Sequence, residues 1–283
     1  MTRAAVGATT PLLTALALLA FAANSLLCRL ALGSQGIDAA SFTTVRLASG
    51  ALILWLIARA RAPAVERLPL DWLSAAMLFA YAVAFSFAYL SLSVGTGALI
   101  LFGAVQLTMF FAGLRAGEHF APLAWAGLLI ALSGLVYLVW PGVTAPEPAG
   151  AVLMAAAGVS WGIYSLRGRG GGDPLRVTAR NFLLAVPMGL LTSLLFLADF
   201  RADGRGFALA VASGAIASGL GYVIWFAALR GLSATSAATV QLAVPVVAAA
   251  GGVVLLAEPV TLRLLVASAV TLGGIGMVVM QRR

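Results

Sequence analysis

Apolar segments of about 20 residues follow one another along this chain from residue 11 almost to its C-terminus. A helix needs about 20 such residues to cross the hydrocarbon core of a bilayer. The chain is 62% hydrophobic and only 9% charged, whereas a soluble domain carries about 25% charged residues. We therefore predict an all-α membrane protein with ten transmembrane helices. Their expected spans are 11–32, 38–58, 72–93, 96–115, 121–140, 150–168, 175–197, 206–229, 235–256 and 261–280.

The distribution of arginine predicts the orientation of these spans. With the N-terminus inside, the outer loops hold only Arg201, Arg205 and Arg263, alongside five acidic residues. The inner loops and ends then hold Arg3, Arg59, Arg61, Arg67, Arg115, Arg167, Arg169, Arg176, Arg230, Arg282 and Arg283. Cytoplasmic loops are enriched in basic residues, so both termini are expected in the cytoplasm.

An internal repeat divides the chain into two halves. Residues 95–138 recur at 235–278, with an offset of 140 that places Glu118 on Glu258 and Gly134 on Gly274. We therefore predict two five-helix repeats, residues 1–145 and 146–283. An odd number of spans inverts the second copy in the membrane, and inverted repeats are a recurrent plan of secondary transporters.

Several functional classes are disfavoured by the composition. The net charge of +8 comes from arginines at span ends, not from the basic face with interleaved aromatic residues that binds nucleic acid. The single Cys28 and single His119 provide neither a disulfide nor a usual zinc site. We expect no cofactor, no metal and no catalytic residues, and an intramembrane enzyme is disfavoured because no dyad lies at membrane depth.

The segment 219–279 carries the most specific family signal. It combines Tyr222 and Trp225 in one helix, Pro245 inside the next and Glu258 before a glycine-rich last helix. The first half repeats this pattern less sharply, through 97–99, Glu118 and Gly134. The chain resembles the EamA-type transporters of the drug/metabolite transporter superfamily. This resemblance implies ten helices in an inverted repeat and transport of small metabolites, commonly by export, in the inner membrane of a bacterium.

Two departures from the family pattern make the halves chemically unequal. Val105 stands where the first repeat would carry its proline, and Asn24 ends a Phe-Ala-Ala-Asn stretch that replaces the usual tryptophan of the first helix. The substrate therefore cannot be copied from a relative.

Amides and aromatic rings within the predicted spans are the candidates for a central cavity. Amides bind carboxylates or amines without burying a charge, although they also join helices. Aromatic rings at helical spacing suit apolar or aromatic solutes or organic cations, the alternative being lipid contact. The expected substrate-binding residues are Asn24, Tyr81, Phe85, Tyr89, Gln106, Trp161, Tyr164, Tyr222, Trp225 and Gln241.

Other residues have expected roles outside this set. Pro245 is a candidate gate because proline bends a helix. Glu118 and Glu258 are expected to be structural, each capping the helix that follows it. Arg46 lies about a third of the way into its span, where it clamps a carboxylate or reaches the outer interface.

The acidic residues bear on energy coupling. All nine fall in loops or at span ends, whereas proton-coupled drug antiporters usually rely on an intramembrane carboxylate. We predict a secondary transporter for amino acids or similar amphipathic solutes, an exporter or facilitator working by alternating access. The alternatives are a proton-coupled multidrug or organic-cation exporter and a non-transporting scaffold or receptor. The expected partners are a small-molecule substrate and the lipid bilayer, with no nucleic acid, and the sequence is compatible with a monomer.

Overall fold

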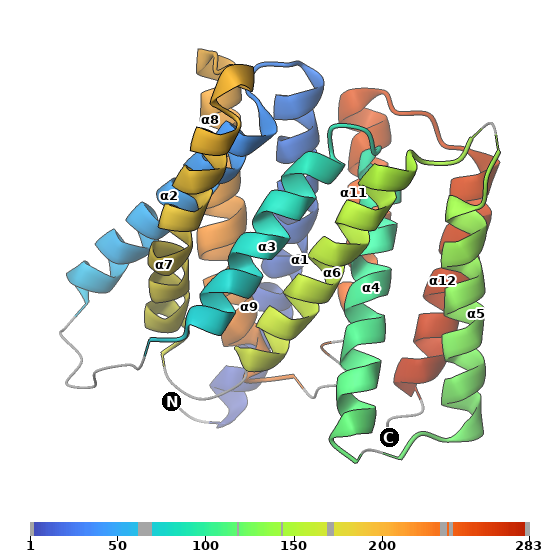
Figure 1. Cartoon of the computed structure of the whole chain (residues 1–283). Helices are drawn as coiled ribbons and strands as arrows, with labels where there is room; N and C mark the ends of the chain where they lie inside the picture. Colours follow the sequence, from blue (N-terminus) through green and yellow to red (C-terminus); the bar gives the residue numbers. More distant parts are fainter. Residues whose placement is uncertain are drawn as a thin grey trace.

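The chain folds into a bundle of long apolar helices, seen here in a computed structural model (Figure 1). The structure describes residues 3–61, 70–117, 119–142, 144–168, 173–232, 237 and 240–280. Its elements are α1 (Arg3–Gly33), α2 (Ala39–Ala60), α3 (Trp72–Ala88), α4 (Val94–Arg115), α5 (Pro122–Val139), α6 (Pro148–Arg167), α7 (Pro174–Leu195), η1 (Leu197–Asp199), α8 (Gly204–Ala212), η2 (Ser213–Leu220), α9 (Gly221–Leu229), α11 (Ala243–Leu256) and α12 (Leu262–Met280).

Seven helices are long and apolar enough to cross a membrane. One of them is the continuous 26-residue helix Gly204–Leu229, which α8, η2 and α9 form together. Three shorter apolar helices, Trp72–Ala88, Ala243–Leu256 and Leu262–Val278, complete the set among the described residues. The prediction of an all-α, multi-pass membrane protein is confirmed.

Acidic side chains begin five of the helices. Asp38, Asp71, Glu147, Asp173 and Asp203 accept hydrogen bonds from backbone N–H groups in the first turns of α2, α3, α6, α7 and α8. These N–H groups have no partner inside their helix, and the helix dipole favours a negative charge there. The acids therefore mark where the chain turns back into the apolar bundle.

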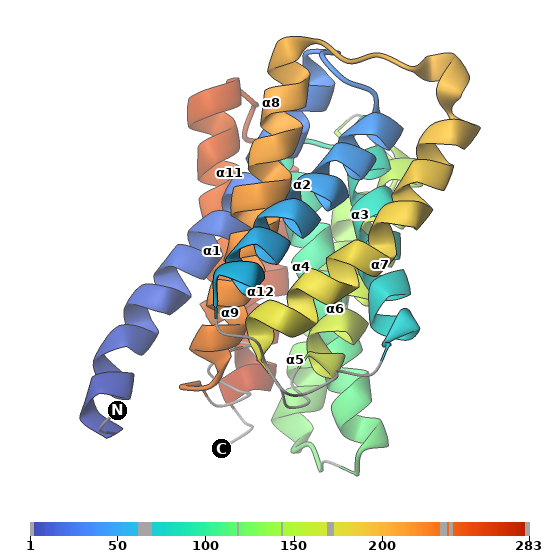
Figure 2. The same ribbon diagram turned by 90° about the vertical axis from the view of Figure 1, so that its left-hand side faces the viewer.

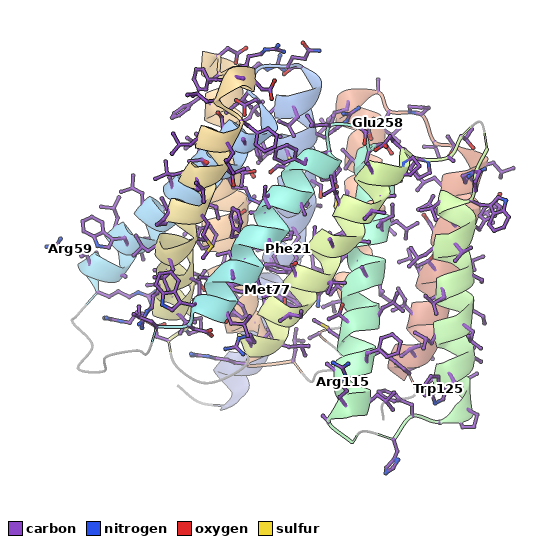
Figure 3. The ribbon with its side chains drawn as sticks, viewed as in Figure 1. Phe21, Arg59, Met77, Arg115, Trp125 and Glu258 are labelled. Atoms are coloured by element: carbon purple, nitrogen blue, oxygen red, sulfur yellow. The ribbon has the colours of Figure 1, made fainter. Side chains whose placement is uncertain are left out.

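The helices run alternately up and down, so that both chain ends lie at one end of the bundle (Figures 1 and 2). Glu258 lies at the opposite end, and Arg115 at the end that carries the termini (Figure 3). We call these the Glu258 end and the terminal end. In Figure 1, α5 and α12 form one edge of the bundle, and α2, α7 and α8 form the other.

Glycine allows α5 and α12 to approach closely. A Cβ on Gly274 would lie 2.5 Å from the Gly127 carbonyl oxygen, and one on Gly134 would lie 2.4 Å from Thr271 Oγ1. Thr271 Oγ1 donates to the Ala131 carbonyl oxygen at 3.5 Å. Small residues of this kind let apolar helices associate by close packing, because lipid supplies no hydrophobic drive between them.

One expected boundary needs correction, and one expected span contains an interruption. The expected span 72–93 ends at Ala88, because the chain turns there and Ser93 caps the next helix. In the expected span 235–256, the described residues Ala237, Val240 and Gln241 are helical, Leu242 forms a turn, and α11 begins at Ala243. Pro245 lies in the first turn of α11 and has no N–H for the Gln241 carbonyl, so it coincides with this interruption.

Candidate functional site

A buried polar network lies at the centre of the bundle and is organised around Arg46 of α2, whose side chain is only 1% exposed. Its Nε donates to Ser218 Oγ at 3.0 Å, and its Nη2 donates to the hydroxyls of Tyr81 and Tyr222, each at 3.0 Å. Nη1 is buried and has no hydrogen-bond partner among the described residues. The guanidinium thus joins α2 to α3, η2 and α9 and keeps one nitrogen unused.

Asn24 of α1 connects this network to a further helix. Its Nδ2 donates to Tyr81 Oη at 3.0 Å, while its Oδ1 accepts from Ser213 Oγ at 2.6 Å and from Ser218 Oγ at 3.4 Å. Buried polar groups cost free energy unless they are paired. The predicted amide is therefore one of the residues that hold the centre together.

The π-helical segment η2 explains how two serines reach one oxygen. Ser213 and Ser218 are five residues apart, a spacing that an α-helix of 3.6 residues per turn directs to different sides. In a π-helix the backbone bonds run from i to i+5, which brings such residues to one face. Short π-helical segments occur frequently at functional sites.

Aromatic rings enclose the network. Trp161 of α6 lies 4.6 Å from the Tyr222 ring centroid and 5.1 Å from that of Tyr81. Phe21 of α1 meets Trp161 at 5.7 Å and Trp225 at 5.6 Å. The rings belong to helices of both sequence halves and form a continuous apolar wall beside the polar groups.

Cation–π contacts place the charge of Arg46 against this wall. Its guanidinium carbon lies 5.0 Å from the Tyr81 ring centroid and 4.9 Å from that of Phe85. These distances fall within the range in which a cation is attracted to a ring face. The site therefore combines one positive charge, several donors and flat apolar surfaces in a buried interior.

Most of the residues predicted from the sequence come together here. Asn24, Tyr81, Phe85, Trp161, Tyr222 and Trp225 line the network or its wall. Tyr89 contacts Phe85 at 4.8 Å and Tyr164 contacts Trp161 at 5.6 Å. Tyr89 and Trp161 are buried, so the alternative of an interfacial belt does not apply to them.

The described contacts do not place the two predicted glutamines in the network around Arg46. Gln241 Nε2 donates to the Ala237 carbonyl one turn earlier, at 3.2 Å. Gln106 is buried on α4, whereas the hydrogen-bond network around Arg46 is built from α1, α2, α3, η2 and α9.

Four residues of the site lie outside the predicted substrate-binding set. The sequence allows Arg46 two roles, a carboxylate clamp or an anchor at the outer interface. Phe21 carries no signal beyond its place in the stretch that departs from the family pattern. Ser213 and Ser218 gave no signal, because serine is common in membrane helices and a five-residue spacing does not mark one face of an α-helix.

Glu258 caps a different helix from the expected one. Its Oε2 accepts from the Val94 N–H of α4 at 2.8 Å, and its Oε1 lies 3.3 Å from Arg29 Nε. The helix that follows it, α12, is instead capped by the Thr261 hydroxyl, which accepts from the Leu264 N–H at 3.1 Å. Glu258 therefore connects both sequence halves at the Glu258 end, while Glu118 lies outside the described residues.

Two pockets open near the Glu258 end. One of about 650 Å³ is lined by Arg29, Asp38, Phe87, Phe196 and Arg201, among others. Another, of about 300 Å³, is lined by Pro245 and Glu258 together with apolar residues of α11 and α12.

Backbone bonds tie the loops together at this end. Asp38 N–H donates to the Arg201 carbonyl at 2.9 Å, and Asp203 N–H donates to the Gly36 carbonyl at 2.7 Å.

A separate side-chain hydrogen bond joins α2 to α3. Thr43 and Ser86, which hydrogen bond to each other at 2.8 Å, are fully buried between these helices.

The terminal end is held by an ion pair. Arg167 Nη2 lies 2.9 Å from Asp71 Oδ1, and Arg167 Nε donates to Ser74 Oγ at 3.0 Å. Partial burial raises the pKa of Asp71, but hydrogen bonds from Ser74 and the nearby Arg167 outweigh this effect, so its pKa lies below the ordinary value.

Comparison with known proteins agrees with this architecture. The model of the EamA-like transporter family matches residues 148–280. The uncharacterised protein PA1977 of Pseudomonas aeruginosa is 52% identical over 273 residues, which are 96% of this chain and 95% of the relative. A solved crystal structure, 21% identical, superposes with a TM-score of 0.67 and covers 98% of this chain and 99% of its own, so it supports the fold alone. The chain belongs to the EamA-like transporter family of the drug/metabolite transporter superfamily.

Proposed function

We propose that this transporter moves small amphipathic metabolites by alternating access and that the network around Arg46 is its substrate site. The observation that carries the proposal is a buried cluster of donors and aromatic rings at the centre of an apolar bundle, contributed by α1, α2, α3, η2 and α9, with Trp161 of α6. Polar groups at membrane depth are costly and mark substrate pathways.

Helix pairing supports ten spans in two inverted halves, residues 1–145 and 146–283. Corresponding members of the halves pack on each other: α2 on α7, α4 on α11 and α5 on α12. The packing of α3 on α6 has its counterpart in α1 on α9. Ala131 and Thr271, which touch at the α5–α12 crossing, are 140 residues apart, the offset of the sequence repeat.

The contacts at the two ends fit alternating access. The Arg29–Glu258 pair and the Asp38–Arg201 contacts hold one end, and the Arg167–Asp71 pair holds the other. Rocking of one half against the other would break one set while the other stays closed. In this proposal Pro245, which lies in the first turn of α11 next to the interruption at Leu242, serves as a hinge for the movement.

Charge supports a cytoplasmic position for the terminal end, in the inner membrane of a bacterium. More of the described arginines lie at the helix ends there than at the helix ends of the Glu258 end, and cytoplasmic ends are enriched in basic residues. Those at the terminal end are Arg59, Arg61, Arg115, Arg167, Arg176 and Arg230. The acids lie at helix ends as well, and we propose facilitated diffusion or export without an intramembrane proton-carrying carboxylate.

The experiment that tests the proposal is uptake of a panel of labelled metabolites into proteoliposomes, with and without a pH gradient. We expect saturable uptake of at least one solute, absent from protein-free liposomes and independent of the gradient. Strict dependence on the gradient would favour the proton-coupled exporter, and no uptake or counterflow of any solute would contradict transport at this site.

A pair of tryptophan variants separates the site from general packing. Trp225→Ala is expected to reduce uptake by at least about tenfold, because a buried ring of the wall is lost. Trp140→Ala, at a position that is 64% exposed, is the matched control and should leave uptake unchanged. Equal effects in the two folded variants would place the substrate elsewhere.

A further inference from the structure

The charge of Arg46 has no counterion among the described residues. The ion pairs of the described residues join Arg29 to Glu258, Arg167 to Asp71 and Arg176 to Asp173, all at helix ends. The groups that Arg46 does contact, the hydroxyls of Tyr81, Tyr222 and Ser218, are neutral. A guanidinium keeps its proton in proteins, so the site carries one net positive charge in a buried interior.

An uncompensated charge in such an interior is costly, and pairing with an opposite charge lowers that cost. Three of the five guanidinium N–H groups are used by Ser218, Tyr81 and Tyr222, and both N–H groups of Nη1 remain. A role limited to joining helices is fulfilled by Nε and Nη2 and leaves Nη1 unexplained. An oxygen anion is the ligand that both the charge and the unused donors match.

Tyr81 adds to this preference for an anion. Its hydroxyl oxygen accepts from Arg46 Nη2 and from Asn24 Nδ2, so its two acceptor positions are taken and its O–H donates, either to the neighbouring Tyr222 hydroxyl or to a substrate oxygen. Among the described residues, the one side-chain carbonyl oxygen of the network is Asn24 Oδ1, and it accepts from Ser213 and Ser218. An ammonium group would therefore find few acceptors, whereas a carboxylate would find donors.

We infer that the substrate of this site is an organic monoanion, a single carboxylate on an apolar or aromatic body. Arg46 Nη1 binds the carboxylate, and the rings of Phe21, Trp161 and Trp225 contact the body. One guanidinium neutralises one negative charge, so a monoanion is preferred over a zwitterion, and both over a cation. The inference rests on the proposed function, because it takes the same cluster as the substrate site.

The test is equilibrium binding to purified protein in detergent, by calorimetry, with sets of probes that share a body and differ in charge. The phenyl set is 3-phenylpropionate, 3-phenylpropionamide, phenylalanine and phenethylamine; parallel indole and six-carbon alkyl sets vary the body. In at least one set we expect the carboxylate to bind at least about tenfold more tightly than its amide, and the amine to bind most weakly. The inference is overturned if no set shows the carboxylate binding more tightly than its amide and its amine, or if no carboxylate binds at all.

Variants on α2 attribute the selectivity to Arg46. Arg46→Met should bring carboxylate and amide affinities to within about twofold, whereas Arg59→Met, which removes an arginine that lies over Trp55 on the same helix, should keep the wild-type preference. Retained carboxylate preference in folded Arg46→Met would contradict the assignment. If that variant does not fold, the wild-type comparison still decides.

Transport separates the two proposals. Carboxylate binding without flux of any solute would overturn the proposed function and leave the inference standing. Flux of amines or neutral solutes with no preference for carboxylates would overturn the inference and leave transport standing.

Discussion

Arg46 and Asn24 make the centre of this bundle polar at the scale of single residues. Between them they bond to side chains of α3, η2 and α9 from positions on α2 and α1. Each bond between membrane helices contributes only about 0.6–2 kcal/mol, so the network fixes the relative positions of the helices more than it determines total stability. A substrate that replaces some of these bonds therefore acts on the arrangement of helices directly.

Asp71 yields a pH prediction at this scale. Its pKa lies below the ordinary value, so the charged form stabilises the folded state above the ordinary pKa and this contribution is lost as the pH falls through the folded pKa. Asp71→Asn should lower thermal stability in detergent at pH 7, by less than about 1 kcal/mol because the ion pair with Arg167 is more than a third exposed and screened.

The difference between wild type and Asp71→Asn should disappear as the pH falls from about 5 to below about 3. Melting curves across this range are the measurement. A difference that persists unchanged at the lowest pH would show that the carboxylate charge is not its cause.

Single residues of the site were predictable to the extent that they carry periodic signals. Tyr81, Phe85 and Tyr89 recur every four residues, and the structure places all three in the buried interior. The role of Arg46 depends on what surrounds it, which its position in a span does not reveal. The serines of η2 meet Asn24 because of the backbone geometry of that segment, and no local sequence rule predicts a π-helical turn there.

Close helix packing gives a prediction at the scale of elements. Gly274→Ala places a methyl group 2.5 Å from Ala131 N and the Gly127 carbonyl oxygen, so α5 and α12 must separate. We expect a loss of about 1–3 kcal/mol, read as a lower melting temperature in detergent.

The neighbouring glycine on α12 is the matched control. A Cβ on Gly273 meets nothing within 4 Å, so Gly273→Ala should be neutral or slightly stabilising, because alanine favours a helix. Equal melting temperatures for the two variants would refute the role of close packing in this helix pair.

The existence and place of the helices followed from apolar length, and the structure shows acidic or proline residues at most of their starts. Helix ends were less predictable where hydropathy continues through a turn. The span expected to reach residue 93 stops at Ala88, since apolar character does not distinguish the turn before Ser93 from helix. The partner of Glu258 was missed for a related reason: a cap from a distant segment, here on Val94 of α4, depends on tertiary packing.

At the scale of the whole molecule, the contacts at the Glu258 end are expected to control access to the site. Glu258→Gln keeps an acceptor for the Val94 N–H but removes the charge that pairs with Arg29. This end should then open more often, and hydrogen–deuterium exchange of residues 90–97 should become faster. Asp203→Asn, which changes a carboxylate that caps α8 at the same end, is the control and should leave exchange in 90–97 close to wild type.

Unchanged exchange in Glu258→Gln would remove the Arg29–Glu258 pair from the gating proposal. Faster exchange in both variants alike would mean that loss of any carboxylate loosens this end. Only a difference between the two variants assigns the effect to the ion pair.

The most direct measurement of all is the side from which the buried centre can be reached during transport. Cys28 is the sole cysteine of the chain and is buried, so Cys28→Ala provides a background for Ser218→Cys in the Arg46 network. We expect a membrane-impermeant thiol reagent to inactivate flux of this double variant in proteoliposomes from either side, and an excess of transported solute to slow inactivation. Full flux that survives the reagent on both sides would show that solute does not pass through this network.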